Sequence, residues 1–567
     1  MPADASKTGN VAVYRLKAMA DLATAEVPDC KRVATGEDQP TGFRYSLWTI
    51  NPPAVTPSWF GPFRDLIDDH PKTRVAGFVL LVNAADSSYA FVGGIGRHKL
   101  IKRFEIEARF GITIAKRIVR ELTTLKGLAQ RDVGGSVHTI DRAFRRSYDP
   151  KLDIDNLHRI LRQMKGSIEK GSSEYREIGS SISAGDSLVV RGSKDFSAML
   201  RFLKKVDELW HSADTGMDIP ELRAINRRTE KPLIDALQAA LAAEIRKFNH
   251  NEHIEQPPDL FIDNIDVGYL PDHVLKYTVI YKGRTEHETQ SDVFKKLAEI
   301  IETPIAENEE GQAHARLNQI RLSLHLEDGI DAGPFRLMTL MCGDVPFNND
   351  SYFIDGGDWF KADEVYISKL NAQLGQVTCF APGDLELQEW VAGEERDYNS
   401  GHATSSFAVL DRHLVRVASE KAGVEFCDLL WQDTTKARLI HVKRATGAEL
   451  RALFAQGCVS AELYAYDDEF RDNTHTAQMS ASNTLTDGDK AALDALRSIP
   501  PDRKCVVYAI ADPTPGHVPI LEDPPTVAGI LNGTLSLFAK VDLFRRVRTI
   551  RELGMHVAVT RIKPYPT

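Results

Sequence analysis

The sequence predicts a multidomain protein of mixed α+β and α/β architecture, whose last third forms a helix, a mixed sheet with an antiparallel hairpin, and a second helix. The chain has 567 residues, more than one hydrophobic core usually serves at roughly 100 to 200 residues per domain. Strand-like and helix-like patterns alternate along it. The apolar fraction of 43% and the charged fraction of 26% are ordinary for a globular protein.

Three domains follow from these patterns. Residues 1–215 are expected to form an α+β domain, with strand-like runs such as RVAGFVLLVN and a helix near 112–126. Residues 216–390 form a second α+β domain, with the strand candidates KYTVIYK, QIRLSLHL and FRLMTLMC. The polar loop EWVAGEERDYNSGHATSS (389–406) is the best boundary before a third domain at 391–567.

Composition excludes several classes of protein. Six scattered cysteines without a CxxC pair support neither a disulfide framework nor a zinc ribbon. No stretch approaches the roughly 18 uncharged apolar residues of a membrane span, and the first residues lack the apolar run of a secretory signal. We therefore expect a cytoplasmic protein without a membrane partner. The net charge of −10 opposes nonspecific coating of DNA, so phosphate binding would rest on local basic patches.

The most informative segment spans residues 408–466. A helix is expected over 411–421, ending at Gly423, which suits a left-handed cap. The strand VEFCDLLW, the polar turn QDTTK and the strand ARLIHVKR follow, and a second helix begins near Thr446. This segment supplies the antiparallel hairpin and the helices of the predicted C-terminal core.

Polar side chains on this hairpin form a candidate catalytic site. Asp428 lies on the first strand, and His441 and Lys443 share one face of the second. A hard cation such as Mg²⁺ or Mn²⁺ requires oxygen ligands, which Asp428 and a nearby backbone carbonyl supply. Lys443 would orient or deprotonate a water molecule and offset charge that builds up on a phosphate.

The second side-chain ligand of the metal is the open question. In metal sites that pair an acid on one strand with a lysine on the next, a second carboxylate usually lies two residues before the lysine. Here that position is His441, and imidazole suits Mn²⁺ better than Mg²⁺. Either the site prefers the softer metal, or His441 acts as a base, or a carboxylate arrives from Glu425, Glu420 or Glu449. Glu425 faces away from Asp428 on a regular strand, so only a bulge would bring it round.

The motifs DGGDWFKAD (355–363), GEERDYN (393–399), VEFCDLLW, LIHVKR and LFAQGCVSAEL resemble a sporadically distributed, largely uncharacterised bacterial family. Its members often lie near mobile elements and phage-defence genes. The resemblance implies a C-terminal PD-(D/E)XK domain, which has a restriction-endonuclease-like core. It also implies that a histidine before Val442 is usual in the family. Gln456, on the helix after the hairpin, falls where the RecB-like branch of these nucleases keeps a glutamine that reaches the active site, which makes it the fourth catalytic candidate.

Basic residues are candidates for nucleic-acid binding at two further places. Arg444, Arg545, Arg546 and Arg548 lie in the C-terminal segment, and Lys99 and Arg103 lie in the first domain. Such residues are suited to backbone phosphates. The alternative is a solvated basic face, with Asp542 and Glu552 as local ion-pair partners.

The leading functional hypothesis is a metal-dependent nuclease that hydrolyses phosphodiester bonds, with DNA favoured over RNA, in bacterial defence or a mobile-element conflict. The alternative is a noncatalytic nucleic-acid-binding or regulatory protein that keeps a degenerate nuclease fold. Self-association as a homo-oligomer, or a partner from a defence system, is compatible with either.

Overall fold

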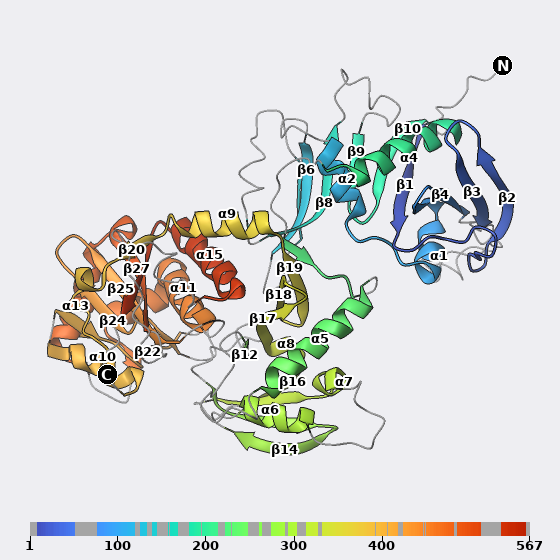
Figure 1. The fold of residues 1–567 in the computed structure, drawn as a ribbon. Helices are drawn as coiled ribbons and strands as arrows, with labels where there is room; N and C mark the ends of the chain where they lie inside the picture. Colours follow the sequence, from blue (N-terminus) through green and yellow to red (C-terminus); the bar gives the residue numbers. More distant parts are fainter. Residues whose placement is uncertain are drawn as a thin grey trace, which may run out of the picture. The chain divides into compact units, whose positions relative to one another are not determined.

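A computed structural model describes most of the chain. The described ranges are 8–50, 76–118, 125–132, 139–143, 157, 159–167, 181–193, 196–213, 222–227, 230–247, 260–262, 274–289, 293–302, 313–326, 331–391, 393–404, 406–417, 423–445, 447, 450–480, 485–511 and 535–562. Two compact units emerge. The first comprises 1–132, 137–220 and 226–231, and the second comprises 133–136, 221–225 and 232–567. Figure 1 follows the chain through both.

The first unit is built on a ten-stranded antiparallel sheet with the order β2-β3-β4-β5-β1-β10-β9-β8-β6-β7. Its strands are β1 (Thr8–Leu16), β2 (Lys31–Asp38), β3 (Phe43–Ile50), β4 (Gly77–Ala84), β5 (Ser87–Gly94), β6 (Leu125–Asp132), β7 (Thr139–Ala143), β8 (Arg159–Ser167), β9 (Ser181–Ala184) and β10 (Leu188–Ser193). Its helices are α1 (Gly96–Arg103), α2 (Phe110–Ile118) and α4 (Phe196–His211).

Both faces of the central strands of this sheet are buried. Leu80 and Val82 of β4 belong to the larger apolar cluster, with residues of α2 and α4. Val79 and Leu81 belong to a second cluster, which includes Leu100 of α1. This alternation follows from the two-residue period of a strand. Helices α2 and α4 therefore cover one face of the sheet, and α1 covers the other.

The second unit begins with two antiparallel sheets. One has the order β11-β19-β18-β17-β12, and the other has the order β14-β13-β15-β16. Their strands are β11 (Leu222–Ala224), β12 (Leu260–Ile262), β13 (Val274–Tyr281), β14 (Arg284–Thr289), β15 (Arg321–Leu326), β16 (Asp331–Arg336), β17 (Met341–Phe347), β18 (Asp350–Asp355) and β19 (Asp358–Ala362). The accompanying helices are α5 (Lys231–Arg246), α6 (Val293–Glu302), α7 (Ala313–Leu317), α8 (Leu337–Leu340) and α9 (Glu364–Leu374).

A mixed six-stranded sheet follows, with the order β20-β28-β27-β25-β24-β21. The last helices and strands are β20 (Thr378–Phe380), α10 (Glu395–Gly401), β21 (Phe407–Val409), β22 (Leu414–Val415), β23 (Val424–Glu425), β24 (Leu429–Gln432), β25 (Ala437–Arg444), α11 (Leu450–Tyr466), α12 (Asp468–His475), β26 (Met479–Ser480), α13 (Asp487–Ala495), β27 (Lys504–Ala511), α15 (Leu537–Glu552) and β28 (His556–Ile562). Strand β24 runs antiparallel to β21 and β25, whereas β25, β27, β28 and β20 run parallel.

Buried polar contacts join this sheet to the preceding one within the second unit. Arg451 of α11 forms an ion pair of 2.7 Å with Asp355 at the end of β18, and both side chains are almost fully buried. Asp344 of β17 accepts hydrogen bonds from the first backbone N–H groups of α15, at Leu537 and Phe538. A carboxylate at a helix N-terminus is stabilised by these free donors and by the helix dipole.

The mixed α+β architecture and the β24–β25 hairpin are confirmed, but the segment before the hairpin differs from expectation. The helix predicted over 411–421 is wrong: a turn at Asp411 and Arg412 leads into β22, and residues 418–422 lie outside the described part. Arg412 adopts a φ of 59°, which a continuous helix does not allow. The helix that precedes β21 and the hairpin is α10 instead. Strand β20 joins the sheet before the predicted boundary at 391.

The predicted strand 424–431 is interrupted. Strand β23 pairs with β22 in a small three-stranded sheet, and β24 pairs with β25 in the six-stranded sheet. Residues 426–428 form the irregular link between them. Such a break releases the side chains from strict alternation. Over the described ranges, none of the helices combines the length and the apolar character that a bilayer span requires.

Candidate metal centre

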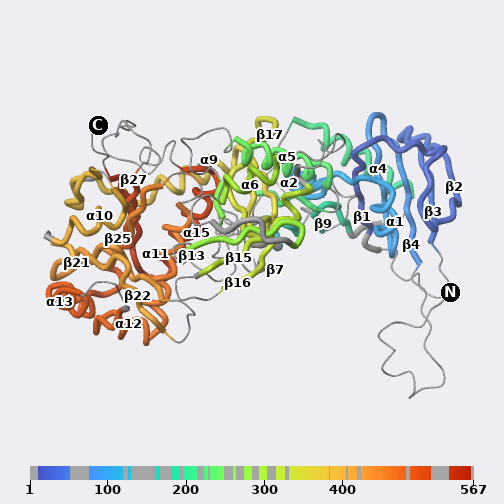
Figure 2. The backbone as a smooth tube through the Cα atoms, turned by 90° about the horizontal axis from the view of Figure 1, so that it is seen from below, coloured from blue at the N-terminus to red at the C-terminus, as the bar shows by residue number. Residues whose placement is uncertain are grey.

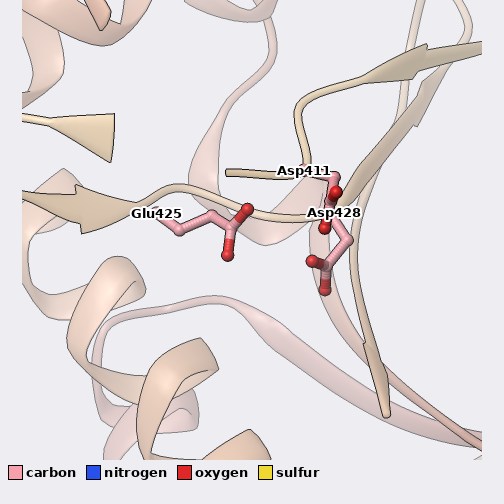
Figure 3. A group of neighbouring side chains, drawn as sticks. All are labelled: Asp411, Glu425 and Asp428. Carbon is pink, nitrogen blue, oxygen red and sulfur yellow. The ribbon is translucent and has the colours of Figure 1, made fainter. Parts of the chain in front are cut away.

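Three carboxylates meet beside the β24–β25 hairpin. Asp411 lies in the turn after β21, Glu425 ends β23, and Asp428 immediately precedes β24. One ligand oxygen from each lies within 4.8 Å of the others, and Figure 3 shows the side chains approaching one another from these separate segments. Two oxygens that share a cation at about 2.1 to 2.4 Å lie at most about 4 to 5 Å apart. The spacing therefore fits a shared divalent cation.

Asp428 is the most buried of the three, at 2% exposure. Its Oδ2 atom accepts a hydrogen bond of 2.7 Å from the backbone N–H of Val442, on the neighbouring strand β25. Burial, followed by the negative charges of Glu425 and Glu395, raises the pKa of Asp428 well above its ordinary value. A bound cation would offset this cost, because an uncompensated charge in a buried site is unfavourable.

Both oxygens of Glu425 have protein donors. Oε2 accepts a hydrogen bond of 2.7 Å from Nε2 of Gln456 on α11, and Oε1 accepts one from the backbone N–H of Arg412. The left-handed backbone of Arg412 aims that N–H group at the carboxylate. Gln456 is 7% exposed, so the packing of α11 fixes the orientation of Glu425. Such hydrogen bonds orient the ligands of a metal.

Helix α10 supplies two further side chains from one face, because they lie four residues apart. Nδ2 of Asn399 donates a hydrogen bond of 3.1 Å to Oδ1 of Asp411. Glu395, one turn earlier, lies 3.7 Å from Nζ of Lys443. The helix is held in place by Tyr398, whose ring stacks on that of Trp390 at a centroid distance of 4.4 Å.

Lys443 reaches the same region from the C-terminal end of β25. Its side chain is 16% exposed, and it follows Val442, whose N–H group binds Asp428. Arg444, the last residue of β25, is exposed. Asp428, Glu425 and Gln456 therefore lie together at one end of the hairpin, and Lys443 lies on the adjoining strand, one residue after the N–H group that binds Asp428.

The structure does not bring His441 into the carboxylate group. Its ring is fully buried near Tyr508, and neither ring nitrogen has a hydrogen-bond partner among the described residues. At Gly457 of α11, an added Cβ would lie 3.1 Å from His441 Cδ2 and 2.7 Å from Tyr508 Cε1, so the helix sits close above the ring. Burial lowers the pKa of His441 to about 3. The imidazole is therefore neutral at ordinary pH.

The other predicted nucleic-acid-binding residues lie elsewhere. Arg545 and Arg546 turn toward the buried Asp542, with shortest N–O distances of 2.7 and 3.6 Å, and both are less than one-fifth exposed. Arg548 pairs with Glu552 at 3.0 Å. In the first unit, Lys99 lies 2.5 Å from Asp29, and Arg103 is exposed. Two alternative carboxylates, Glu420 and Glu449, lie outside the described residues.

Sequence reasoning missed Asp411, Glu395 and Asn399 as members of this site. Asp411 was expected at the start of a helix, where it would read as an ordinary capping residue. Glu395 and Asn399 both lie within the motif GEERDYN, which carried part of the family resemblance. Their four-residue spacing is the signal that could have placed both on one helix face.

The chain belongs to a family of unknown function, DUF6119, whose model matches residues 11–563. This family covers nearly the whole chain, in agreement with a resemblance to an uncharacterised family. No curated protein and no solved structure matches the chain.

Proposed function

We propose that this protein is a metal-dependent nuclease that hydrolyses phosphodiester bonds at the Asp411–Glu425–Asp428 group, with DNA favoured over RNA. The observation that carries the proposal is the convergence of three carboxylates at one end of the β24–β25 hairpin, where Lys443 follows the residue that binds Asp428 and pairs with Glu395. Asp428 is buried and the other two carboxylates are half-buried, and charged groups gathered in this way with a raised pKa mark a candidate functional site. A restriction-endonuclease-like core is part of the proposal, supported by the antiparallel hairpin, the mixed sheet and the helix α11 that follows.

The donor set suits Mg²⁺ or Mn²⁺. All three side chains offer hard oxygen ligands, and the burial of Asp428 together with its raised pKa favours a cation in contact with it. Gln456, Asn399 and the Val442 N–H group hold the three carboxylates in position. When bound, the cation would polarise a phosphate oxygen and lower the pKa of a water molecule.

Lys443 and Glu395 would position the attacking water and offset charge in this proposal. The ammonium group of Lys443 would face the scissile phosphate, orient the attacking water and offset charge that builds up in the transition state. Glu395, 3.7 Å from Lys443 Nζ, would keep the ammonium group directed toward the site. Arg444, exposed at the end of the same strand, would contact a neighbouring backbone phosphate.

The decisive experiment is incubation of the full chain with plasmid DNA, single-stranded DNA and RNA, in Mg²⁺, in Mn²⁺ and in EDTA. We expect cleavage that depends on the divalent cation and is lost in Asp428→Ala. The matched control is Asp494→Ala, which removes an exposed carboxylate from α13. Equal cleavage by Asp428→Ala and the wild type would reject the site.

One observation favours the alternative, a noncatalytic nucleic-acid-binding or regulatory protein. His441 stands at the usual position of a ligand carboxylate, but its ring is buried next to Tyr508 and does not belong to the carboxylate group. If Asp411 does not replace that ligand, the site would bind nucleic acid without cutting it. Metal-dependent binding without cleavage of any of the three substrates would favour this alternative. A role in bacterial defence rests on the family resemblance and is part of the proposal.

A further inference from the structure

Strand β2 is one edge of the ten-stranded sheet, and among the described strands it pairs with β3 alone. Seven of its eight residues are exposed, and Asp38 is half-buried. Figures 1 and 2 both place β2 at the outer edge of the sheet of the first unit. We propose that this edge is a dimerisation surface, on which β2 of a second copy of the chain pairs in antiparallel orientation.

The geometry of β2 leaves the edge accessible. Val33 is 49% exposed, although it is a large apolar residue. The register shift between β2 and β3 is confined to Arg32–Ala34, and residues 34–38 pair regularly with β3. The middle of the strand carries the small residues Ala34, Thr35 and Gly36, which let another backbone approach closely. An exposed edge of this kind is a template for a further strand.

The charges along β2 identify a second copy as the partner and antiparallel as the orientation. The strand reads KRVATGED, with Lys31 and Arg32 at one end and Glu37 and Asp38 at the other. Two copies in antiparallel orientation bring the basic end of each beside the acidic end of the other. Parallel pairing would set like charges side by side, which is unfavourable. The antiparallel arrangement has a twofold axis near the middle of the strand and closes as a dimer.

Lys31 and Glu37 are the residues to test, because the other two charges have local roles. Arg32 donates to the carbonyl oxygens of Leu22 and Ala23. Asp38 accepts hydrogen bonds from the backbone N–H and the hydroxyl group of Thr41, in the turn to β3. The side chains of Lys31 and Glu37 are exposed, so their substitution should leave the fold intact.

The test is sedimentation velocity of the full chain and of the variants Lys31→Glu and Glu37→Lys. The wild type should be a dimer. Each variant opposes like charges twice across the axis, so its dimer should dissociate on the order of tenfold more readily. An equimolar mixture of the two variants restores both opposite-charge pairs and should form a heterodimer. Salt should weaken the wild-type dimer, because exposed charges are screened.

The control is Lys490→Glu, a charge reversal at an exposed position of α13 in the other unit, which should leave the dimer unchanged. A wild-type chain that stays monomeric up to about 100 µM would overturn the proposal. So would two variants that dimerise as well as the wild type. If β2 paired instead with the opposite edge strand β7, mixing would not restore association and longer assemblies would form, which would also overturn it.

Discussion

The carboxylate of Asp428 is held against strand β25 by a hydrogen bond of 2.7 Å from the backbone N–H of Val442. This contact sets Asp428 next to the part of β25 that carries Lys443. Because the donor is a backbone group, the contact depends on the β24–β25 pairing rather than on a second side chain. The hairpin itself therefore positions the central acid of the proposed site.

Asp428→Asn should stabilise the protein in the absence of metal. The folded pKa of Asp428 lies above its ordinary value, so between the two pKa values the folded state binds more protons than the unfolded state. The free energy of unfolding therefore falls as the pH rises through that window. At neutral pH in EDTA, the Tm of the variant should exceed that of the wild type, by roughly 2 to 4 °C for each kcal/mol of penalty removed.

Adding Mg²⁺ or Mn²⁺ should reverse this order. A ligand that binds only the folded state raises the Tm, and at 100 times its Kd contributes about 2.7 kcal/mol. The wild type should gain this stability, whereas Asp428→Asn should gain little. Differential scanning fluorimetry with and without metal measures both effects, and Asp494→Asn is the control. A metal response that is the same in Asp428→Asn and in the wild type would count against the site.

Gln456→Ala and Asn399→Ala should weaken metal binding without removing a ligand. These amides hold Glu425 and Asp411 in place, and loss of such a contact typically costs about 10- to 100-fold in affinity. Isothermal titration with Mn²⁺ measures the change. Gln432→Ala is the matched control, because Gln432 lies on the same hairpin but donates to a backbone carbonyl. Unchanged affinity in both test variants would show that the amides of α10 and α11 do not position the metal ligands.

The hairpin and the partners of Asp428 could be predicted from the sequence, because a two-residue period and a polar turn are local signals. Strand β25 appears where the alternation of ARLIHVKR placed it, and β24 covers the end of VEFCDLLW, with a turn at Asp433–Lys436 between them. The inclusion of Glu425 depended on a break in the strand. That break occurs at residues 426–428, where the chain passes from one sheet to another.

The rest could not be predicted because it depends on packing between distant segments. The residues after Asp411 carry a helix-like pattern, yet Leu414 and Val415 pair with β23 and β26. Tertiary pairing overrides local propensity in such a case. Nothing local indicates that His441 would be enclosed by Gly457 and Tyr508. That enclosure separates His441 from the carboxylates, although it shares a strand face with Lys443.

His441→Leu should improve stability at acid pH and leave metal preference unchanged. The folded pKa of about 3 lies below the unfolded value, so the folded state binds fewer protons and loses stability as the pH falls from about 6.5 toward 3. The loss approaches about 1.4 kcal/mol per pH unit. A Tm series from pH 7 to pH 4 should fall less steeply for the variant. A lower ratio of Mn²⁺ to Mg²⁺ activity in the variant would instead identify His441 as a ligand.

Arg444 and Arg546 should behave differently when they are changed to Ala. Arg444 is exposed beside Lys443, so its loss should lower the slope of log K against log salt for DNA binding by about 0.9. Arg546 lies against the buried Asp542, which Arg545 also contacts, so its loss should lower stability by about 1 to 3 kcal/mol. Salt titrations of binding and thermal melts separate the two effects. A flattened salt slope without a lower Tm in Arg546→Ala would instead indicate that α15 contacts nucleic acid.

The most direct test of the proposed nuclease is single-turnover cleavage of DNA by Lys443→Ala, beside the wild type and Lys436→Ala. Lys436 is an exposed lysine in the turn at the other end of the same hairpin. An interaction made mainly in the transition state appears in the rate rather than in substrate binding. We expect Lys443→Ala to cleave at least about 100-fold more slowly with unchanged DNA affinity, and Lys436→Ala to cleave normally. Equal metal-dependent cleavage by all three proteins would contradict this expectation.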